Sequence, residues 1–269
     1  MKMFCITLED NHYQKIKDFG YLPVGLGTNI KNDNFLRDNT GNNISKKNPY
    51  YGEYSFHFWL WKNNYLNFKN NEWIGFCQYR KFWVINEKNE KIINLNQLSQ
   101  NLIKNIPKNY ENYESILGNA FYVNEFKLSK FLKRNFKKMI QKPSLFFDSK
   151  KRNIKFHFDM MHGKGNLDKA IDLLDKKDRY DFRKFVNSEV SFNPHNMLIC
   201  KSQAILNDYY NDIFPWLEKC EKEFGFNLKG YGLKRIYGFL AERYLSFWFR
   251  KNLKFKTLPI IFKDITDLN

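Results

Sequence analysis

The segments DNTGNNISKKNPYYGEYSFHFWLWKN, residues 38–63, and EWIGFCQYR, residues 72–80, combine many hydrogen-bonding side chains with many aromatic rings. Asp, Asn, Ser and Gly at the start favour a turn, because they close local hydrogen bonds or adopt positive φ. Asn48 suits the N-cap of a helix and Pro49 its first position, so we predict a helix from Asn48 to about Trp61. A stretch built only for packing would not gather so many polar groups, and we interpret it as a ligand site.

Aromatic side chains cover nearly every face of this predicted helix, which is typical of a helix buried on most sides. Its N-terminus, with Lys46 and Lys47 beside it, would be a fixed positive end suited to an anion. The alternative is a capped core helix with two solvated lysines.

Trp73–Cys77 is an apolar run of strand length, and Gln78, Tyr79 and Arg80 follow it directly. In open α/β sheets ligands lie at the carboxyl ends of strands, so this polar triplet is expected at the ligand site. The planar guanidinium of Arg80 is suited to a diphosphate, and a surface arginine at a strand end is the alternative. The run Met3–Leu8 predicts the first strand of the chain.

These motifs resemble those of a bacterial family of capsular and exopolysaccharide glycosyltransferases long known only as a domain of unknown function. Members of that family usually read D-N/D-T-G-x-N-I-S-x-K-N-x-x-Y-x-E and then I-G-x-x-H-Y-R-R. Weaker similarity continues through HNMLICK, residues 195–201, and GFLAERYL, residues 238–245. Two positions depart from the pattern, because Gln78 stands where the family usually has His and Lys81 replaces the second Arg.

The resemblance implies an α/β fold with a GT-A-like nucleotide-sugar-binding sheet flanked by helices and a mostly helical C-terminal part. It implies one glycosyltransferase domain over residues 1–269, with a donor-binding part of about 1–125 and an acceptor-binding part of about 126–269. The implied donor is a nucleotide-diphosphate sugar. The expected donor is a UDP-hexose, with the furanose form of the sugar as one alternative. The donor-binding residues expected are Asp38, Asn39, Lys46, Lys47, Asn48, Tyr51, Glu53, Gln78, Tyr79 and Arg80.

In the second half of the chain, KFHFDMMHGKGN brings His157, Asp159 and His162 close together in sequence. Their spacing matches neither HxH nor the helical HExxH arrangement, so they make a weak metal site. In a member of the family they would line the acceptor pocket, and satisfied loop histidines are the alternative. Glu189–Cys200 is predicted as a strand that contains His195 and Asn196.

A long final helix is predicted from about Leu233 to Phe249, with Arg235, Glu242 and Arg243 among apolar residues. Carboxylates in such surroundings tend to be paired or to have raised pKa values, as a general base requires. Glu242 is therefore the first candidate for the base, Asp159 the second and His162 a further one, and an ion pair of Glu242 with an arginine is the structural alternative. The expected acceptor-binding residues are His157, His195, Asn196, Arg235 and Arg243.

The chain contains no Asp-x-Asp triplet, the usual holder of the metal that binds a donor diphosphate in two-layered nucleotide-sugar folds. We therefore expect no divalent metal or other cofactor. Arg80, Lys46, Lys47 and the helix N-terminus would neutralise the leaving diphosphate instead. Direct displacement at the anomeric carbon would invert its configuration.

The formal net charge of +17 and the isoelectric point near 9.5 predict an anionic partner but do not choose among nucleotides, nucleic acid, lipid and polysaccharide. The alternative functions are a basic nucleic-acid-binding protein and a noncatalytic saccharide-binding module. No RNP, KH, zinc-finger or helix-turn-helix pattern is present, so nucleic acid is not expected. The expected partners are the nucleotide sugar and an oligosaccharide or lipid-linked glycan acceptor.

Four widely spaced cysteines without a CxxC pair favour a reducing cytosol over a disulfide framework. No apolar run approaches the ~18 residues of a membrane span. KLSKFLKRNFKKMIQK, residues 127–142, predicts a basic amphipathic helix of the kind that lies on anionic membranes, and packing of its apolar stripe on the protein is the alternative. We expect a cytoplasmic protein that binds peripherally to the inner membrane face.

Overall fold

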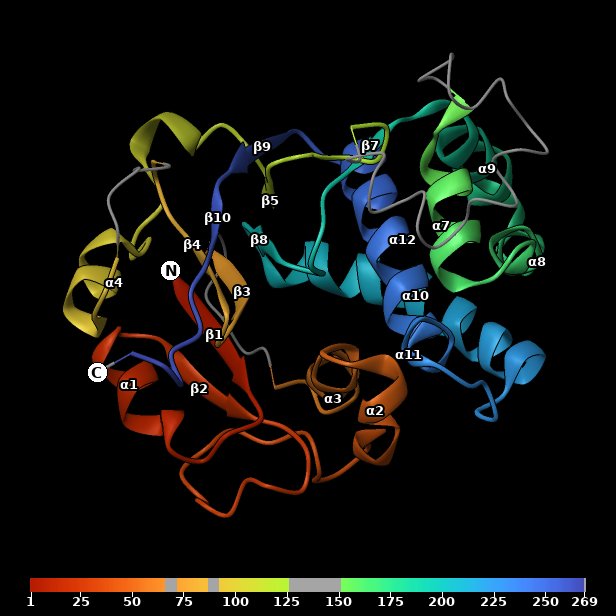
Figure 1. Ribbon diagram of the computed structural model, residues 1–269. Coiled ribbons are helices and arrows are strands. Elements are labelled where there is room, and N and C mark those ends of the chain that lie inside the picture. The colour runs from red at the N-terminus through yellow and green to blue at the C-terminus, as the bar shows by residue number, and fades with distance from the viewer. Residues whose placement is uncertain (66–71, 87–91, 126–150, 269) are drawn as a thin grey trace.

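The computed structural model describes residues 1–65, 72–86, 92–125 and 151–268, and Figure 1 shows a sheet on one side and a group of helices on the other. The N-terminal half contains β1 (Lys2–Thr7), α1 (His12–Asp18), β2 (Leu22–Gly25), a 3-10 helix (Ser45–Lys47), α2 (Asn48–Tyr51), α3 (Tyr54–Lys62), β3 (Ile74–Gln78), β4 (Lys81–Trp83), α4 (Leu95–Asn101), a second 3-10 helix (Lys108–Tyr110), β5 (Ser115–Gly118) and β6 (Phe121–Tyr122). The C-terminal half contains α7 (Ile154–His162), α8 (Asn166–Asp172), α9 (Lys176–Ser188), β7 (Ser191–Phe192), β8 (Leu198–Cys200), α10 (Gln203–Phe224), α11 (Tyr231–Lys234), α12 (Ile236–Asn252), β9 (Phe255–Leu258) and β10 (Ile260–Phe262).

Among the described residues, eight strands form one mixed sheet with β3 in its interior. β1 pairs in parallel with both β2 and β3, and β3 pairs in antiparallel with β8. Next to β8 lies β5, which pairs in parallel with β9. β4 and β10 form an antiparallel branch at the carboxyl end of β3. The apolar residues Ile74 to Cys77 of β3 are all buried, as expected of a strand that is covered on both faces.

Two hydrophobic cores lie on opposite faces of the sheet, because successive side chains of a strand point to opposite sides. Phe4 of β1 and Phe76 of β3 belong to a large core that they share with α2, α3, α10 and α12. Met3 and Cys77 belong to a smaller core that they share with α1 and α4. The helices α7, α8 and α9 pack beyond α12, so the C-terminal part is mostly helical (Figure 1). The predicted α/β fold, a sheet flanked by helices with a helical C-terminal part, is confirmed.

The described strands β8, β9 and β10 come from the C-terminal half and pair with β3, β5 and β4 of the N-terminal half. The predicted functional division near residue 125 therefore stays a prediction, since one sheet draws strands from both sides of it. Within the described part of the chain, no helix is both long and apolar enough to cross a bilayer. The basic segment 127–142 lies outside the described residues.

The predicted strands Met3–Leu8 and Trp73–Cys77 match β1 and β3 to within a residue. Most of the predicted final helix, Leu233–Phe249, lies in α12, but its start is separated at Arg235 and belongs to α11. Two other predictions are wrong. The single helix from Asn48 to Trp61 is broken into α2 and α3, and the single strand Glu189–Cys200 is two short strands, β7 and β8, separated by a turn. The physical reason for each break lies in the contacts of the pocket described below.

Candidate functional site

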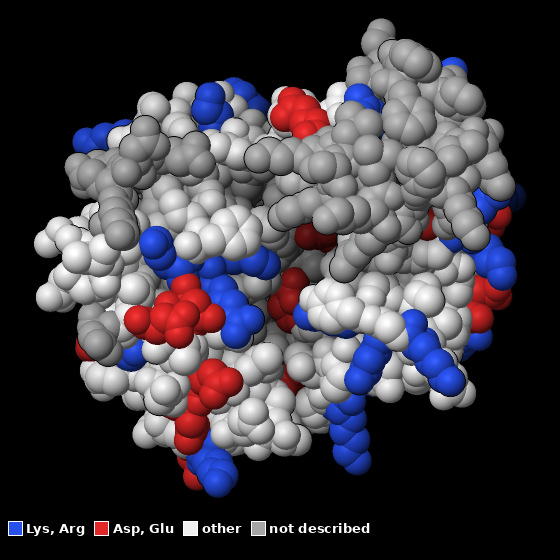
Figure 2. Space-filling view, viewed as in Figure 1, with Lys and Arg blue, Asp and Glu red and all other residues white. Residues whose placement is uncertain are grey.

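A pocket of about 350 Å³ opens where the carboxyl ends of β1 and β3 meet the α2–α3 break and the start of α12. Its lining includes Thr7, Gly52, Glu53, Gln78, Lys81 and Arg235. Figure 2 shows this face of the molecule hollowed between the sheet and the helical part, with basic atoms beside the hollow and acidic atoms in its depth. The position agrees with the rule that ligands of α/β proteins bind at the carboxyl ends of strands.

The turn between β3 and β4 determines which of its side chains face the pocket. Gln78 and Lys81 are paired across this two-residue turn, and Lys81 Nζ donates to Gln78 Oε1 across 3.2 Å. Gln78 Nε2 in turn donates to the carbonyl oxygen of His195 across 3.0 Å. Arg80, at the tip of the turn, donates from Nε to Asp264 Oδ2 across 2.5 Å, and its side chain is 60% exposed. The side chains of Gln78 and Lys81 therefore lie together, whereas the side chain of Arg80 is largely exposed and binds Asp264.

His195 and Asn196 form a strained turn between β7 and β8. Both residues have positive φ, 81° and 53°, which is uncommon for residues other than glycine. The backbone N–H of His195 donates to Glu242 Oε1 across 2.5 Å, and Asn196 Nδ2 donates to Glu53 Oε1 across 2.9 Å. These two carboxylates, one from α12 and one from the α2–α3 break, hold the turn and so divide the segment predicted as one strand. Such strain persists where surrounding contacts determine the conformation, and it is frequent at functional sites.

Gly52 causes the break between α2 and α3, because its φ of 59° and ψ of −136° are incompatible with a helix. A Cβ atom at this position would lie 2.4 Å from Nη2 of Arg235. Arg235 Nη2 lies 3.6 Å from Glu53 Oε2, so the glycine makes room for an ion pair beside the pocket. Asn48 does not cap α2, because its Nδ2 donates to the Gly52 carbonyl oxygen at 3.0 Å and to Ser55 Oγ at 3.0 Å.

The anion site predicted at the helix N-terminus has little physical support in this geometry. α2 is only four residues long and follows a 3-10 helix, so it has neither a long macrodipole nor a free first turn. Lys47 Nζ donates to Glu221 Oε1 of α10 across 2.7 Å, and Tyr51 donates from its hydroxyl to Glu221 Oε2 across 2.9 Å. Lys46 is exposed.

The pocket divides the ten predicted donor-binding residues into two groups. Asn48, Glu53, Gln78, Tyr79 and Arg80 line it. Asp38, Asn39, Lys46, Lys47 and Tyr51 lie outside its lining, and their donor-binding role stays a prediction. Burial raises the pKa of Asp38, whose Oδ2 is buried without a hydrogen-bond partner among the described residues. Asn39 lines a different, shallow pocket beside Trp59.

The charges around the pocket act on one another. Burial lowers the pKa of Lys81, and the carboxylates of Glu53 and Glu242 oppose that shift, so both lie near enough to act on the ammonium. Burial and the charge of Lys81 lower the pKa of His195 to about 3, so its imidazole is neutral at physiological pH. The Lys81 ammonium also lies 5.7 Å from the ring centroid of Phe262.

Glu242, the first candidate for the base, is bonded at both carboxylate oxygens. Oε1 accepts from His195, and Oε2 accepts from Nη1 of the neighbouring Arg243, which is the ion pair anticipated as the structural alternative. Arg243 is 2% exposed, contacts His157 Nδ1 through Nη2 at 3.2 Å and lies over the Phe192 ring. The structure thus brings together Glu242 and Arg243 of α12, His157 of α7 and His195 of the turn between β7 and β8.

Asp159 and His162 are engaged elsewhere in the helical part. Asp159 Oδ2 lies 2.8 Å from Lys155 Nζ, and its Oδ1 accepts the backbone N–H of Gly165 at 3.1 Å. His162 Nδ1 contacts the carbonyl oxygen of Gly232 at 3.0 Å. Burial, reinforced by the charge of Arg243, lowers the pKa of His162 to about 3, which makes its imidazole a weak base. Both residues stabilise the connection of α7 to its neighbours.

Lys81 and Tyr231 are among the pocket residues that were not anticipated from the sequence. Lys81 was noted only as a departure from the family pattern, yet Lys81, Phe82 and Trp83 continue the strand pattern just after the polar pair Tyr79 and Arg80. That pattern is a signal of a hairpin, which would have placed Lys81 opposite Gln78. Tyr231, 69% exposed at the start of α11, had no local signal.

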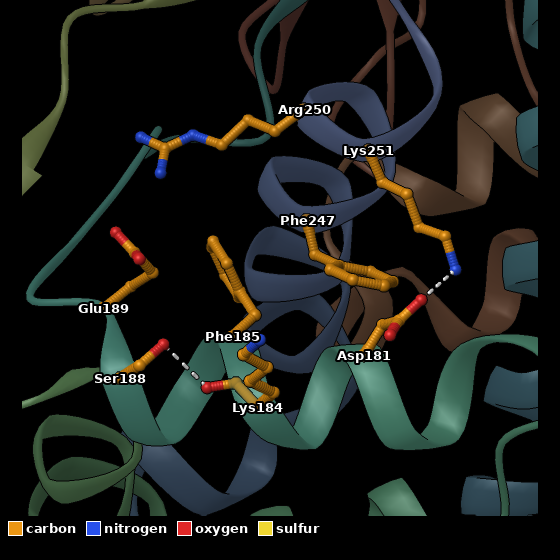
Figure 3. A pocket seen from close by; sticks show the side chains of 8 residues that line it. All are labelled: Asp181, Lys184, Phe185, Ser188, Glu189, Phe247, Arg250 and Lys251. Carbon is orange, nitrogen blue, oxygen red and sulfur yellow. Dashed lines mark hydrogen bonds and ion pairs between the residues drawn. The ribbon is translucent and has the colours of Figure 1, made fainter.

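A second pocket lies between α9 and α12, away from the residues just described (Figure 3). Three of its charged side chains have partners within the protein: Lys251 Nζ lies 2.6 Å from Asp181 Oδ2, and Arg250 Nε donates to Asn193 Oδ1 across 3.0 Å. The described residues contain no group of three or more His, Cys, Asp or Glu side chains arranged to hold a metal ion.

A family model described as "Domain of unknown function (DUF4422)" matches residues 5–253. The comparison with curated proteins found no match. Among solved structures, the chain is similar to the apo structure of WbbM, a bifunctional glycosyltransferase, with a TM-score of 0.63 and 21% sequence identity. The similarity covers 97% of this chain but only 45% of that one, and at this identity it shows a shared fold.

Proposed function

We propose, from the premise that the chain belongs to the DUF4422 family, that the protein is a glycosyltransferase that uses a nucleotide-diphosphate sugar. The observation that carries this proposal is the pocket at the carboxyl ends of β1 and β3, where basic side chains lie beside a carboxylate and an amide. Basic groups suit a diphosphate, and the carboxylate and amide suit sugar hydroxyls. The shared fold with a bifunctional glycosyltransferase supports the same reading.

Different residues of the pocket are suited to different parts of the donor. Arg80 and Arg235 present guanidinium groups at the edges of the pocket, where they can contact phosphate oxygens. Glu53 and Gln78 accept or donate hydrogen bonds to the hydroxyls of the donor sugar. The donor that we expect from the family resemblance is a UDP-hexose, which makes the protein a hexosyltransferase.

Glu242 is assigned as the base because it binds the His195–Asn196 turn, which also holds Gln78 of the pocket, and because its carboxylate lies near enough to Lys81 to act on that ammonium. The acceptor hydroxyl oxygen attacks the anomeric carbon and gives its proton to Glu242. The bond from that carbon to the diphosphate oxygen breaks, its electron pair leaves with the diphosphate, and the anomeric configuration inverts. Each oxygen of a carboxylate has two lone pairs, so the bonds to His195 and Arg243 leave room for the proton.

The acceptor that we propose is a growing capsular or surface polysaccharide, free or lipid-linked. Two exposed aromatic rings contact the histidines that are grouped with Glu242 and Arg243. Phe262, 60% exposed, contacts the ring of His195, and Phe121, 39% exposed, contacts the ring of His157. Aromatic faces can pack against the apolar faces of sugar rings, so these two residues are suited to a saccharide.

A thermal-shift screen tests the proposal. The melting temperature of the purified protein is measured with UDP-glucose, UDP-galactose, UDP-galactofuranose, UDP-N-acetylglucosamine and GDP-mannose, because a bound donor stabilises the folded state by mass action. We expect at least one nucleotide sugar to raise the melting temperature and to be consumed in the presence of an oligosaccharide acceptor.

The alternatives give different results in the same screen. If no nucleotide sugar raises the melting temperature but the protein retards nucleic acid in a gel, it is a nucleic-acid-binding protein. That binding should weaken steeply as the salt concentration rises. A protein that is stabilised by saccharides but never transfers or hydrolyses a nucleotide sugar is a noncatalytic saccharide-binding module. Either result would overturn the proposal.

A further inference from the structure

We infer that Lys81 is the principal cation that binds the diphosphate of the donor, in the place that the sequence had suggested for Lys46 and Lys47, with Arg80 and Arg235 as further contacts at the edges of the pocket. The inference rests on the proposed function, because it identifies the phosphate ligand within the same pocket. Lys81 is part of the pocket lining, whereas Lys46 and Lys47 are not.

The β3–β4 turn positions the ammonium of Lys81. Because Gln78 and Lys81 are cross-strand partners, their side chains lie on the same face of the hairpin. The Lys81 ammonium is held at the carboxyl end of β3 by its bond to Gln78 Oε1, and Gln78 is held by the His195 carbonyl oxygen. This chain of hydrogen bonds fixes the charge at the end of a buried strand, where the pocket opens.

The neighbouring cations already have acidic partners. Arg80 is paired with Asp264, Arg235 with Glu53 and Lys47 with Glu221. Among the described residues, the hydrogen bond of Lys81 is to a neutral amide, and no carboxylate lies within ion-pair distance of its ammonium. An ammonium has three donors, so two remain to bind phosphate oxygens.

The electrostatics of Lys81 favour an anionic ligand. A partly buried ammonium without a paired acid costs free energy of desolvation, and an incoming diphosphate offsets that cost. Burial lowers the pKa of Lys81, and a bound anion would raise it again. As the bond to the anomeric carbon breaks, negative charge accumulates on the diphosphate, and a fixed positive charge stabilises it there.

Calorimetric titration with UDP and with uridine tests the inference. Lys81→Met removes the charge and keeps the length of the apolar stem, Lys81→Arg keeps the charge, and Lys176→Met, at an exposed lysine of α9, is the matched control outside the pocket. We expect Lys81→Met to weaken UDP binding at least 10-fold and to leave uridine binding unchanged. We expect Lys81→Arg and Lys176→Met to bind UDP within about threefold of the wild type.

A measurement on the wild type serves if the Lys81 variants do not fold. Reductive methylation of Lys81, followed by mass spectrometry, should be slowed by UDP and not by uridine. The inference alone is overturned if the wild type binds UDP and Lys81→Met binds it equally well, or if UDP leaves the methylation of Lys81 unchanged. If the wild type binds no nucleoside diphosphate among UDP, GDP, ADP, CDP and dTDP, the proposed function fails and the inference fails with it.

Discussion

The backbone N–H of His195 donates to the Oε1 atom of Glu242 across 2.5 Å. The next residue, Asn196, binds Glu53, so one strained turn connects a carboxylate of the pocket with a carboxylate on α12. Because Gln78 holds the same turn through the carbonyl oxygen of His195, the end of β3 is part of this arrangement. The backbone of His195 and Asn196 thus joins the proposed donor side of the site to the proposed acceptor side.

Replacing Glu242 by Gln tests its role as the base. The amide keeps the shape of the side chain and can still accept from His195, but it cannot take a proton from the acceptor hydroxyl. We expect kcat to fall by about 10²- to 10⁴-fold, the usual contribution of a general base, while the KM for the donor changes little. Initial rates of transfer over a range of donor concentrations measure both constants.

Asp159→Asn is the matched control, because Asp159 is engaged by Lys155 and Gly165 rather than by the pocket. This variant should lose some thermal stability and keep near-normal turnover. If Glu242→Gln also turns over normally, neither carboxylate is the base.

Replacing Gly52 by Ala tests the importance of the space that it leaves for Arg235. The alanine would be strained at a φ of 59°, and its Cβ would displace the guanidinium from Glu53. We expect the free energy of unfolding to fall by about 1–3 kcal/mol and donor binding to weaken. Urea denaturation and donor titration measure these effects.

Gly225 offers a control for the backbone strain alone. Its φ of 61° and ψ of −160° resemble those of Gly52, but among the described residues, its two chain neighbours aside, none comes within 4 Å of the position of its Cβ. Gly225→Ala should therefore cost stability without weakening donor binding. Equal donor affinity in the two variants would contradict a role of the Gly52–Arg235 contact in the site.

The parts of the fold that local sequence determines were predictable. β1 and β3 are short apolar runs with polar residues at their ends, and the polar residues after β3 do line the pocket. β9 and β10 were not predicted, because Pro259 interrupts the segment and its alternation is short. Their pairing with β5 and β4 depends on residues far away in the chain.

The composition of the site was less predictable for the same reason. Nothing near Lys47 in the sequence shows that Glu221 of α10 will pair with it, and nothing near Gly52 shows that Arg235 will fill the space beside it. The hairpin that pairs Lys81 with Gln78 was the exception, since its signal was local. Long-range ion pairs therefore decide which cations of this basic chain remain available to a ligand.

Stability should decrease below pH 6.5 because the histidines are buried in the neutral form. Burial lowers the pKa of His57, which is 1% exposed, to about 3. Between pH 6.5 and 3 the unfolded chain binds a proton there that the folded chain does not, so folding loses up to about 1.4 kcal/mol per pH unit for this group. The pKa values of His157, His162 and His195 are lowered in the same way, so these groups add to the loss of stability.

His57→Gln isolates one contribution to this pH dependence. Glutamine does not titrate and can replace the contact of His57 with the Tyr210 hydroxyl, which lies 2.7 Å away. Urea unfolding at pH 7.0 and 5.0 should show a smaller loss of stability for the variant than for the wild type. An equal loss in both proteins would mean that His57 is protonated in the folded state.

Transfer should be insensitive to chelators. The chain lacks Asp-x-Asp, and in the proposed mechanism the charge of the leaving diphosphate is neutralised by side chains such as Lys81 and Arg80. Initial rates with and without 10 mM EDTA should therefore agree. Loss of activity in EDTA, with recovery on addition of Mn²⁺ or Mg²⁺, would show that a metal supplies the charge instead.

The last prediction concerns the basic segment 127–142, whose sequence is typical of a helix that binds anionic lipid. Each Lys or Arg near an anionic membrane contributes about 1 kcal/mol, and the attraction decays over a Debye length of about 8 Å at physiological salt. We expect the protein to sediment with anionic liposomes at low salt and to be released at high salt. Replacing Lys130, Lys133, Lys137 and Lys138 by Gln should abolish sedimentation and leave transfer to a short soluble acceptor nearly unchanged. Continued sedimentation of the quadruple variant would assign membrane binding to another part of the surface.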